Sequence, residues 1–340
     1  MALTSILRST AMLLLILAVA MIPPMLVAFS AGETSAPSYL FAAATALLFG
    51  AGAYAAPLGK RHPSGFRGAM IVILIWWIVV PVFAAPPIMA EGLSFADAYF
   101  EAVSAMTTTG AWLSHNSAIA TRAGALWRAE LQWLGGLASL AIAAAIFIRP
   151  AFIGIDTLLP PFSRGERDSY IRPLRNAVVS FSGVYLTVTM FAFAAIAIAG
   201  APTLDAVIMA MTTAASGGFI PHNDGLAGYS TGVEAALFFF TLLGGVNFIL
   251  LARVMKGERE KLRDIETGAY LMLVLWAAIL FWVTAGAGDV VLIAPQLFNA
   301  ASLVTTNGYL IGEPPPLLVA LVTAIIGAAA VSTAGGFKIL

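Results

Sequence analysis

The 340-residue sequence is 60% hydrophobic and only 10% charged, with a mean hydropathy of +0.94. A soluble domain of this length cannot bury so much apolar surface, so the composition indicates a membrane protein with several spans. The formal net charge is zero, and the lack of cysteine excludes disulfides and thiol chemistry. The three histidines, His62, His115 and His222, are too scattered to form a metal site.

Eight segments approach the length of about 20 apolar residues that a helix needs to cross the hydrocarbon core. They lie at 11–29, 39–57, 69–89, 126–148, 177–199, 233–255, 268–286 and 317–335. The first also resembles a secretory signal peptide, but its 19 uncharged residues exceed the usual apolar core, so we expect a retained helix. Three stretches, 95–106, 203–214 and 293–304, are too short to span, and we expect them to be re-entrant helices.

Basic residues orient the spans, because lysine and arginine favour the cytoplasmic side. With the N-terminus inside, only Arg122 and Arg128 of the 17 basic residues fall outside. The outer side carries ten acids against these two bases, a net charge of −8: Glu33, Glu91, Asp97, Glu101, Glu130, Asp205, Asp224, Glu234, Asp289 and Glu313. An acidic mouth concentrates cations, although acids are also tolerated outside because they weigh little in topology.

Each short stretch leads into a small turn built around one glycine. The stretches start at Asp97, Asp205 and Pro295, and the aligned glycine follows 13 positions later in each. The three turns are Thr107, Thr108, Thr109 and Gly110; Ala215, Ser216, Gly217 and Gly218; and Thr305, Thr306, Asn307 and Gly308.

Glycine reaches positive φ without penalty, so successive carbonyls in such a turn can face one way. Carbonyls arranged in this way replace the hydration shell of an alkali ion, and nearby hydroxyls add oxygen ligands or hold the turn from behind. The C-terminal end of each short helix also places partial negative charge at the turn. We therefore predict a cation filter. Further on, small and polar residues over 327–336 predict an interrupted helix, which is tolerated at membrane depth only against protein or a water-filled cavity.

Four motifs together carry a family resemblance: FEAVSAMTTTGA at 100–111, LLGGVN at 242–247, TTNGY at 305–309 and VSTAGGFK at 331–338. Over essentially the whole chain, the sequence resembles the Trk/Ktr/HKT superfamily of potassium transporters, most closely its bacterial TrkH-type subunits. The resemblance implies that K⁺ binds the backbone carbonyls of Gly110, Gly218 and Gly308. It also implies a gate in an irregular loop, whose residues here are Gly327, Ser332, Thr333, Gly335, Gly336 and Lys338.

The expected fold is an all-α integral membrane protein made of repeats of span, re-entrant pore helix, filter turn and span. We expect an N-terminal two-helix unit at 1–58 and pore repeats at 59–150, 151–257 and 258–340. The family has a fourth repeat that this sequence lacks, and we expect a truncated sequence rather than a second polypeptide. Ala215 is another departure, because it lacks the hydroxyl of Thr107 and Thr305.

The resemblance implies potassium uptake through the bacterial inner membrane by the pore-forming subunit of a Trk-type system, with a cytoplasmic N-terminus. It also implies a homodimer and a cytosolic TrkA-type nucleotide-binding ring, which the loop 256–264 would contact. That loop is equally well explained as a plain cytoplasmic basic loop. We expect no cofactor besides the K⁺ substrate, and no nucleic-acid partner.

Three alternatives stay open. Sodium conduction is the nearest, but glycine at all three aligned positions favours potassium, because the resemblance associates serine at the first position with sodium. A truncated, non-conducting or accessory fragment is the second. A membrane enzyme is the third, and it is disfavoured because Glu101, Glu130 and Glu234 are expected at the periphery of the spans. For Glu101 we expect a structural hydrogen bond to neighbouring backbone.

Overall fold

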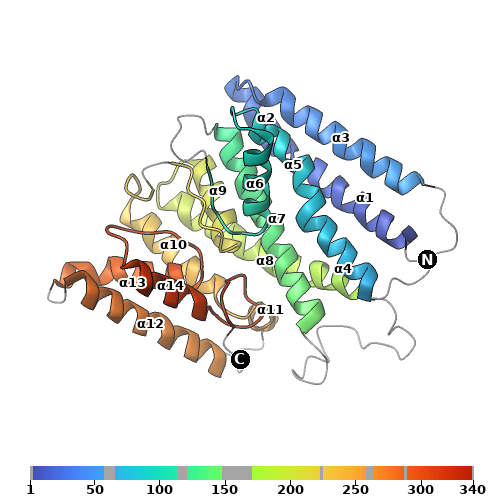
Figure 1. Cartoon of the computed structure of the whole chain (residues 1–340). Helices are drawn as coiled ribbons and strands as arrows, with labels where there is room; N and C mark the ends of the chain where they lie inside the picture. Colours follow the sequence, from blue (N-terminus) through green and yellow to red (C-terminus); the bar gives the residue numbers. More distant parts are fainter. Residues whose placement is uncertain are drawn as a thin grey trace. The chain divides into compact units, whose positions relative to one another are not determined.

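The structure, a computed structural model, describes residues 3–56, 66–113, 121–147, 171–222, 225–257, 264–286 and 289–338 (Figure 1). Over these ranges the chain is helical, and no β-sheet is formed. Two compact units are present. Unit 1 contains residues 1–131 and 141–180, and unit 2 contains residues 132–140 and 181–340.

Unit 1 is built on a pair of packed helices near the N-terminus. Its helices are α1 (Leu3–Ala20), α2 (Ile22–Ala31), α3 (Ala36–Ala55), α4 (Phe66–Leu74), the π-helical turn η1 (Ile75–Val79), α5 (Val80–Met89), α6 (Phe95–Met106) and the two ends of α7 (Arg122–Phe147), whose middle, residues 132–140, belongs to unit 2. α1 packs along α3, and α5 packs against both α3 and α6. Trp127 joins three of these helices, because its ring meets Tyr39 edge-on and its Nε1 donates to the carbonyl of Ala84 at 3.0 Å.

Unit 2 holds the second half of the chain. Its elements are most of α8 (Ile171–Ile198), α9 (Thr203–Ala214), α10 (Thr231–Gly244), α11 (Phe248–Met255), α12 (Ile265–Gly286), the 3₁₀ turn η4 (Val290–Leu292), α13 (Ile293–Val304) and α14 (Leu317–Ile326). α13 packs against α12, α14 and α10, and α10 also packs against α9.

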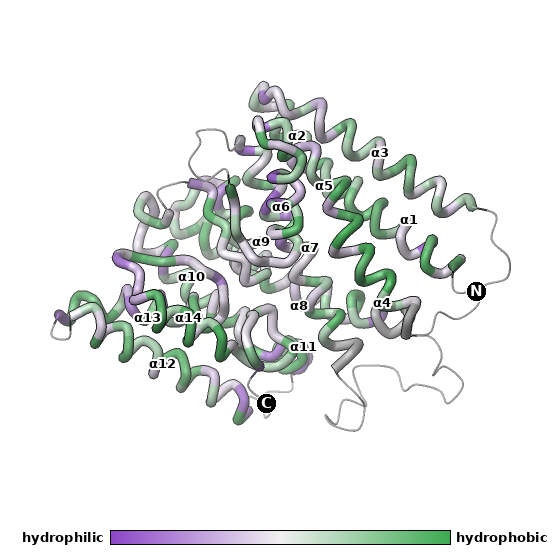
Figure 2. Tube along the Cα trace, in the orientation of Figure 1, coloured by the Kyte–Doolittle hydropathy of each residue, from purple (hydrophilic) through white to green (hydrophobic). Residues whose placement is uncertain are grey.

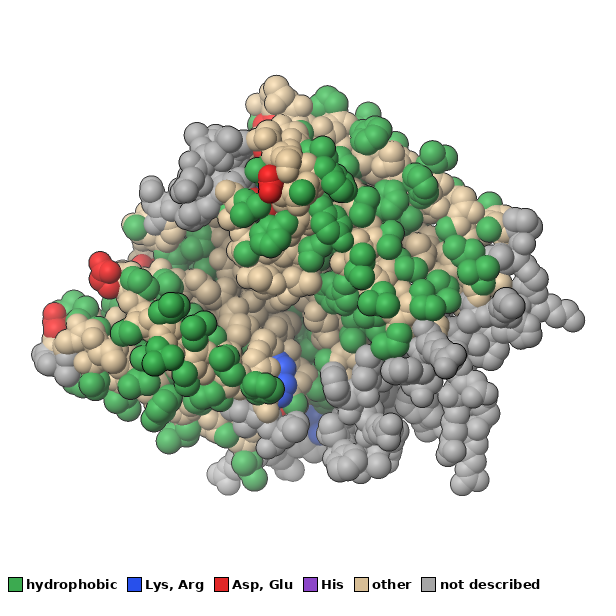
Figure 3. Space-filling model, in the orientation of Figure 1, with side chains coloured by type: hydrophobic (Ala, Val, Ile, Leu, Met, Phe, Trp, Pro, Cys, Tyr) green, Lys and Arg blue, Asp and Glu red, His purple; other side chains and the backbone are tan. Residues whose placement is uncertain are grey.

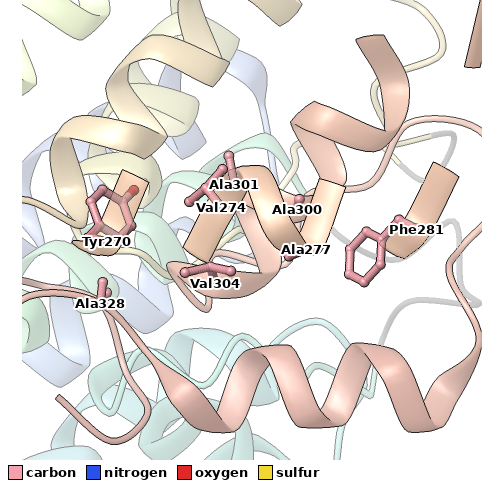
Figure 4. Packing of buried hydrophobic residues seen from close by; sticks show 9 residues of the cluster. Tyr270, Val274, Ala277, Phe281, Ala300, Ala301, Val304 and Ala328 are labelled. Atoms are coloured by element: carbon pink, nitrogen blue, oxygen red, sulfur yellow. The ribbon is translucent and has the colours of Figure 1, made fainter. Parts of the chain in front are cut away.

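Small side chains let α12 and α13 approach closely (Figure 4). Tyr270, Val274 and Phe281 of α12 belong to one buried cluster with Ala300 and Ala301 of α13, and Val274 lies beside Ala301. Small residues at helix contacts are typical of membrane proteins, in which packing rather than the hydrophobic effect drives association. Ala328 and Ala334, from the segment after α14, belong to the same buried cluster.

Five helical segments of the described residues are long and apolar enough to cross a membrane. They are Leu3–Ala31, Ala36–Ala55, Gly68–Met89, Asn176–Ile198 and Ile265–Gly286. At most 44% of the residues in each tested stretch are buried, so most of every span presents apolar side chains outward. Hydrophobic residues run along most of α5 and α12 (Figure 2) and cover much of the face drawn in Figure 3. Such exposure indicates contact with lipid, and five of the eight expected spans are confirmed.

The three short stretches are helices with the expected bounds. α6, α9 and α13 contain 12 residues each. At a rise of about 1.5 Å per residue, 12 residues reach about 18 Å, which is well short of the hydrocarbon core of about 30 Å. Each is therefore too short to span the membrane by itself.

The expectation of one continuous helix over 233–255 is wrong, because α10 and α11 meet at a bend of 104°. Asn247 begins the new helix, since its side-chain oxygen accepts the backbone N–H of Ile249 at 2.9 Å. Gly245 lies flat against buried Tyr270, and a Cβ there would sit 2.5 Å from the ring atom Cζ. A helix-capping asparagine and a close ring contact therefore break a segment whose apolar length predicts a span.

We expect the substitution Gly245→Ala to destabilise the protein by about 1–3 kcal/mol, because the fully buried ring of Tyr270 must move to admit a methyl group. Gly268→Ala, in the interior of α12, is the matched control. A Cβ at Gly268 meets no atom within 4 Å, so this change should stabilise the helix by up to about 1 kcal/mol. Thermal unfolding in detergent measures the stability of both variants. Equal melting temperatures would contradict the close contact between Gly245 and Tyr270.

Candidate ion-binding site

The three glycine turns share one unusual backbone conformation. Two residues before the glycine, φ is +56° at Thr108, +52° at Ser216 and +56° at Thr306. The glycines that follow, Gly110, Gly218 and Gly308, have φ of +71°, +65° and +91°. A left-handed conformation costs a non-glycine residue about 1 kcal/mol or more, so three repetitions at aligned positions indicate a constrained design.

Hydrogen bonds at the helix ends explain which way the turns face. In each turn the residue before the glycine donates its N–H to the carbonyl five residues earlier. The pairs are Thr109 to Ser104 at 2.9 Å, Gly217 to Thr212 at 2.8 Å and Asn307 to Ser302 at 2.8 Å. In a planar trans peptide the preceding C=O points opposite to the N–H. The carbonyls of Thr108, Ser216 and Thr306 therefore point away from their helices, where a cation can reach them.

The hydroxyls at the first position of the turns brace the helix ends. Thr107 donates to the carbonyl of Val103 at 2.9 Å, and Thr305 donates to that of Ala301 at 2.7 Å. Of the two roles considered from the sequence, these contacts favour support from behind. The departure at Ala215 therefore removes a brace rather than an outward-pointing oxygen.

A second set of hydroxyls, which the sequence analysis missed, lies six residues before each glycine. Ser104 donates to the carbonyl of Ala111 at 2.7 Å, and Thr212 donates to that of Phe219 at 3.1 Å. Both bonds fix the residue that follows the glycine of the turn. The third member, Ser302, has a buried hydroxyl with no hydrogen-bond partner among the described residues. Alignment of the three segments on their glycines would have shown this recurring hydroxyl.

A third support, also missed, lies nine residues before each glycine. Glu101 accepts the backbone N–H of Leu113 at 2.7 Å, which confirms the structural bond expected for it. Asn299 accepts the N–H of Ile311 at 2.8 Å and donates to its carbonyl at 3.0 Å. At the second turn the matching residue is Met209, and its counterpart Pro221 has no N–H to satisfy.

Glu101 belongs to a buried ion cluster in unit 1. Arg128 of α7 donates through Nε to Glu101 at 2.8 Å and through Nη2 to Glu91 at 2.7 Å. All three residues are at most 5% exposed. Glu101 and Glu130, which we expected at the periphery of the spans, are both buried in the protein, with only 1% and 6% of their surface exposed. The two carboxylates neutralise the charge of Arg128, which makes its burial possible.

An acidic residue at the start of α9 is also held by hydrogen bonds. Asp205 accepts from the phenol of Tyr229 at 3.0 Å and lies 2.9 Å from Nε2 of His222. Burial, and next the Asp205 carboxylate, raise the pKa of Tyr229 well above its usual range. Tyr229 therefore remains a neutral donor to Asp205 at physiological pH, which anchors the loop before α10 to the second short helix.

The second and third turns touch within unit 2, whereas the first turn belongs to unit 1. A Cβ on Gly218 would lie 1.6 Å from the carbonyl oxygen of Asn307, so only glycine fits there. Buried Tyr309 extends the contact, because its hydroxyl lies 2.7 Å from that of Thr212 and 3.2 Å from that of Thr213. The aromatic residue after the glycine of the third turn is therefore anchored on α9, the short helix that precedes the second turn.

The segment after α14 is irregular, as expected. α14 ends at Ile326, and Gly327 has φ of +71°. Gly327 lies against Gly336, where a Cβ would sit 2.5 Å from the Cα of Gly327. The loop also bonds to the broken span, because Phe248 donates its N–H to Val331 at 3.0 Å and Ala329 donates to Gly245 at 3.2 Å.

The same loop bonds to both filter turns of unit 2. The hydroxyls of Ser216 and Thr333 lie 3.0 Å apart, and the N–H of Gly335 donates to the hydroxyl of Thr306 at 2.6 Å. Lys338 turns back on the loop, with its ammonium 3.2 Å from the hydroxyl of Ser332. The structure thus brings the expected gate residues together with two of the three expected filter turns.

The oxygen ligands available at the turns suit an alkali cation. Backbone carbonyls and hydroxyls are hard oxygen ligands. Among the described residues, no group of three or more His, Cys, Asp or Glu side chains could hold a metal ion. The chemistry available at the turns is therefore the replacement of a hydration shell by neutral oxygens.

Residues 38–340 match the family model described as TrkH, cation transport protein. The chain is 29% identical to the Trk system potassium uptake protein TrkI of Halomonas elongata, over 98% of this chain and 70% of that protein. It is 28% identical to TrkH of the same organism, over 100% of this chain and 74% of that protein. The crystal structure of the potassium transporter TrkH from Vibrio parahaemolyticus superposes with a TM-score of 0.83 and 25% identity, covering 99% of this chain and 73% of that one.

Replacement of Arg128 by methionine should destabilise the protein by about 3–5 kcal/mol, because it leaves the carboxylates of Glu91 and Glu101 buried without an opposite charge. Arg122→Met removes the same charge from an exposed position of the same helix and should change stability by no more than about 0.5 kcal/mol. Thermal unfolding in detergent distinguishes the two.

Adding Glu91→Gln and Glu101→Gln to the Arg128→Met background should restore part of the loss, because no buried charge then remains unpaired. An equal melting temperature for the two arginine variants would show that the cluster does not hold unit 1 together.

Proposed function

Because this chain belongs to the TrkH family of cation transport proteins, we propose that it is the pore-forming subunit of a Trk-type potassium uptake system. The observation that carries the proposal is the shared backbone of the three turns, with left-handed residues at Thr108, Ser216 and Thr306. Curated relatives of similar sequence are named Trk system potassium uptake proteins.

In this proposal, the ion sheds its water at carbonyls of the three turns. The proposed ligands lie at Gly110, Gly218, Gly308 and the residues that precede them in each turn. Neutral oxygens remove no charge from the ion, so binding stays weak enough for release. The C-terminal ends of α6, α9 and α13 add partial negative charge, which compensates for lost hydration. A membrane potential that is negative inside lowers the free energy of a monovalent cation entering the cytoplasm by about 2.3 kcal/mol per 100 mV.

We place the gate at the irregular loop that follows α14. Gly327, Gly335 and Gly336 supply the small residues at close contacts, and Ser332, Thr333 and Lys338 supply its polar contacts. Because the loop bonds to Ser216 and Thr306, a movement of the loop would disturb the second and third turns directly. We also assign an N-terminal unit at 1–58 and pore repeats at 59–150, 151–257 and 258–340.

The proposed setting is a bacterial inner membrane, crossed several times, with the N-terminus in the cytoplasm. Support for this orientation comes from the basic residues, of which only Arg122 and Arg128 fall outside. A homodimer and a cytosolic TrkA-type ring are the proposed partners, and they follow from the family alone. No catalytic role is assigned to the buried carboxylates, because Glu91 and Glu101 are bound to Arg128.

Ion flux tests the proposal. The protein is reconstituted into liposomes loaded with potassium chloride, and uptake of labelled rubidium or sodium is followed from a dilute external solution. We expect rubidium uptake well above that of protein-free liposomes, with stronger competition from external potassium than from external sodium. Sodium uptake without rubidium uptake would overturn the assignment to potassium.

Gly308→Ala should lower rubidium uptake about tenfold or more. Its φ of +91° strains any other residue, and a Cβ there projects into open space beside the turn. Gly312→Ala is the matched control, because Gly312 also has positive φ, at +68°, and open space around its Cβ position. Both variants should unfold at similar temperatures. Equal rubidium uptake by the two variants would show that Gly308 does not contribute to the ion path.

A further inference from the structure

Two helices of unit 2 carry a buried polar side chain at the same place relative to a glycine pair. Gln132 of α7 lies three residues before Gly135, and Thr241 of α10 lies three residues before Gly244. Each is 1% exposed. A buried polar group on a membrane helix is costly unless it is bonded, so its partner indicates its use.

Both partners occupy the position immediately before a filter glycine. Nε2 of Gln132 donates to the carbonyl oxygen of Gly217 at 3.1 Å. Oγ1 of Thr241 accepts from Nδ2 of Asn307 at 3.0 Å. Along the chain, α7 follows the first turn and α10 follows the second. In both cases the helix that follows one turn therefore holds the next turn.

Gln132 also explains why the second turn contains two glycines. A Cβ on Gly217 would lie 2.4 Å from Oε1 and 2.6 Å from Cδ of Gln132. The amide therefore lies directly against the peptide before Gly218, and a side chain at 217 would displace it. The aligned residues of the other turns, Thr109 and Asn307, carry side chains.

We propose that Gln132 and Thr241 are positioning residues, each of which holds the residue before a filter glycine in place. Gln132 does so through the backbone carbonyl of Gly217, and Thr241 does so through the side-chain amide of Asn307. The inference rests on the proposed ion filter and names the side chains that set its ion discrimination. Selectivity among alkali ions depends on the number and field of the coordinating carbonyls. A turn in which this residue is free to move holds its carbonyls less firmly around the ion, so loss of either bond lowers discrimination between rubidium and sodium.

The test uses near-isosteric substitutions with matched controls. Gln132→Met and Thr241→Val remove the bonds with little change in volume. Gln296→Met removes another buried glutamine, in α13. Thr323→Val removes a buried hydroxyl that bonds to Val319 and Ala320 of its own helix. Amide hydrogen exchange over each turn and the rubidium-to-sodium flux ratio are measured for the full chain in liposomes.

We expect exchange about three- to tenfold faster at 215–219 in Gln132→Met and at 305–309 in Thr241→Val, each without a change at the other turn. The flux ratio should fall at least about threefold in both variants and stay unchanged in both controls. Unchanged exchange and an unchanged ratio overturn the inference.

The two proposals fail in different ways. A wild-type protein that carries no rubidium overturns the proposed function, whereas the exchange measurement still tests the positioning bonds. A merely structural role for these residues predicts faster exchange throughout unit 2, with no change in the flux ratio, and that outcome also overturns the inference. If Gln132→Met fails to fold, Thr241→Val decides, because it changes only a hydroxyl into a methyl group.

Discussion

The constraint on which the structure depends is that backbone groups at membrane depth must find partners without water. At the ends of α6, α9 and α13 this constraint is satisfied for the backbone N–H groups within the helix, but not for the neighbouring carbonyls. The N–H groups of Thr109, Gly217 and Asn307 bond back into their helices. Peptide planarity then turns the preceding carbonyls outward, so satisfying the donors creates the candidate ion ligands. The positive φ at Thr108, Ser216 and Thr306 is the conformational cost of that reversal.

Glu101 and Asn299 occupy the same position, nine residues before a turn glycine, but one is charged and the other is neutral. This difference in charge determines which side chains must surround them. Asn299 is neutral and supplies both a donor and an acceptor to Ile311. Glu101 accepts the corresponding N–H, that of Leu113, with a charged carboxylate, and a buried charge requires a partner of opposite charge. Arg128 provides it, and Glu91 in turn shares Arg128. Buried Arg128 is thus connected, through Glu101 of α6, to the backbone N–H of Leu113 beyond the first turn.

Sequence patterns predict the helices well. They predict an interruption where the local composition marks it, as at 327–336, but not where it depends on distant contacts. The short helices are found because apolar length alone separates 12 residues from 20. The bend at 245–247 cannot be predicted from the sequence, because α10 and α11 together have the apolar length of a span. The break also depends on Tyr270, which comes from α12. Gln132 is hidden for a similar reason. Its partner lies 85 residues away, and only the extra glycine at 217 hints at it. Local patterns report local structure, whereas these features depend on contacts distant in sequence.

The left-handed residues of the second and third turns have a further consequence for gating. In that conformation their side chains are free of the helix, and the hydroxyls of Ser216 and Thr306 reach Thr333 and Gly335 of the loop after α14. The residue whose backbone turns a carbonyl outward is therefore also the residue whose side chain bonds to the proposed gate. A loop that moves must break these bonds, and it then removes support from the most strained residue of each turn. In the proposed mechanism, single residues therefore couple ion coordination at the turns to gating by the loop, and no longer pathway between them is required.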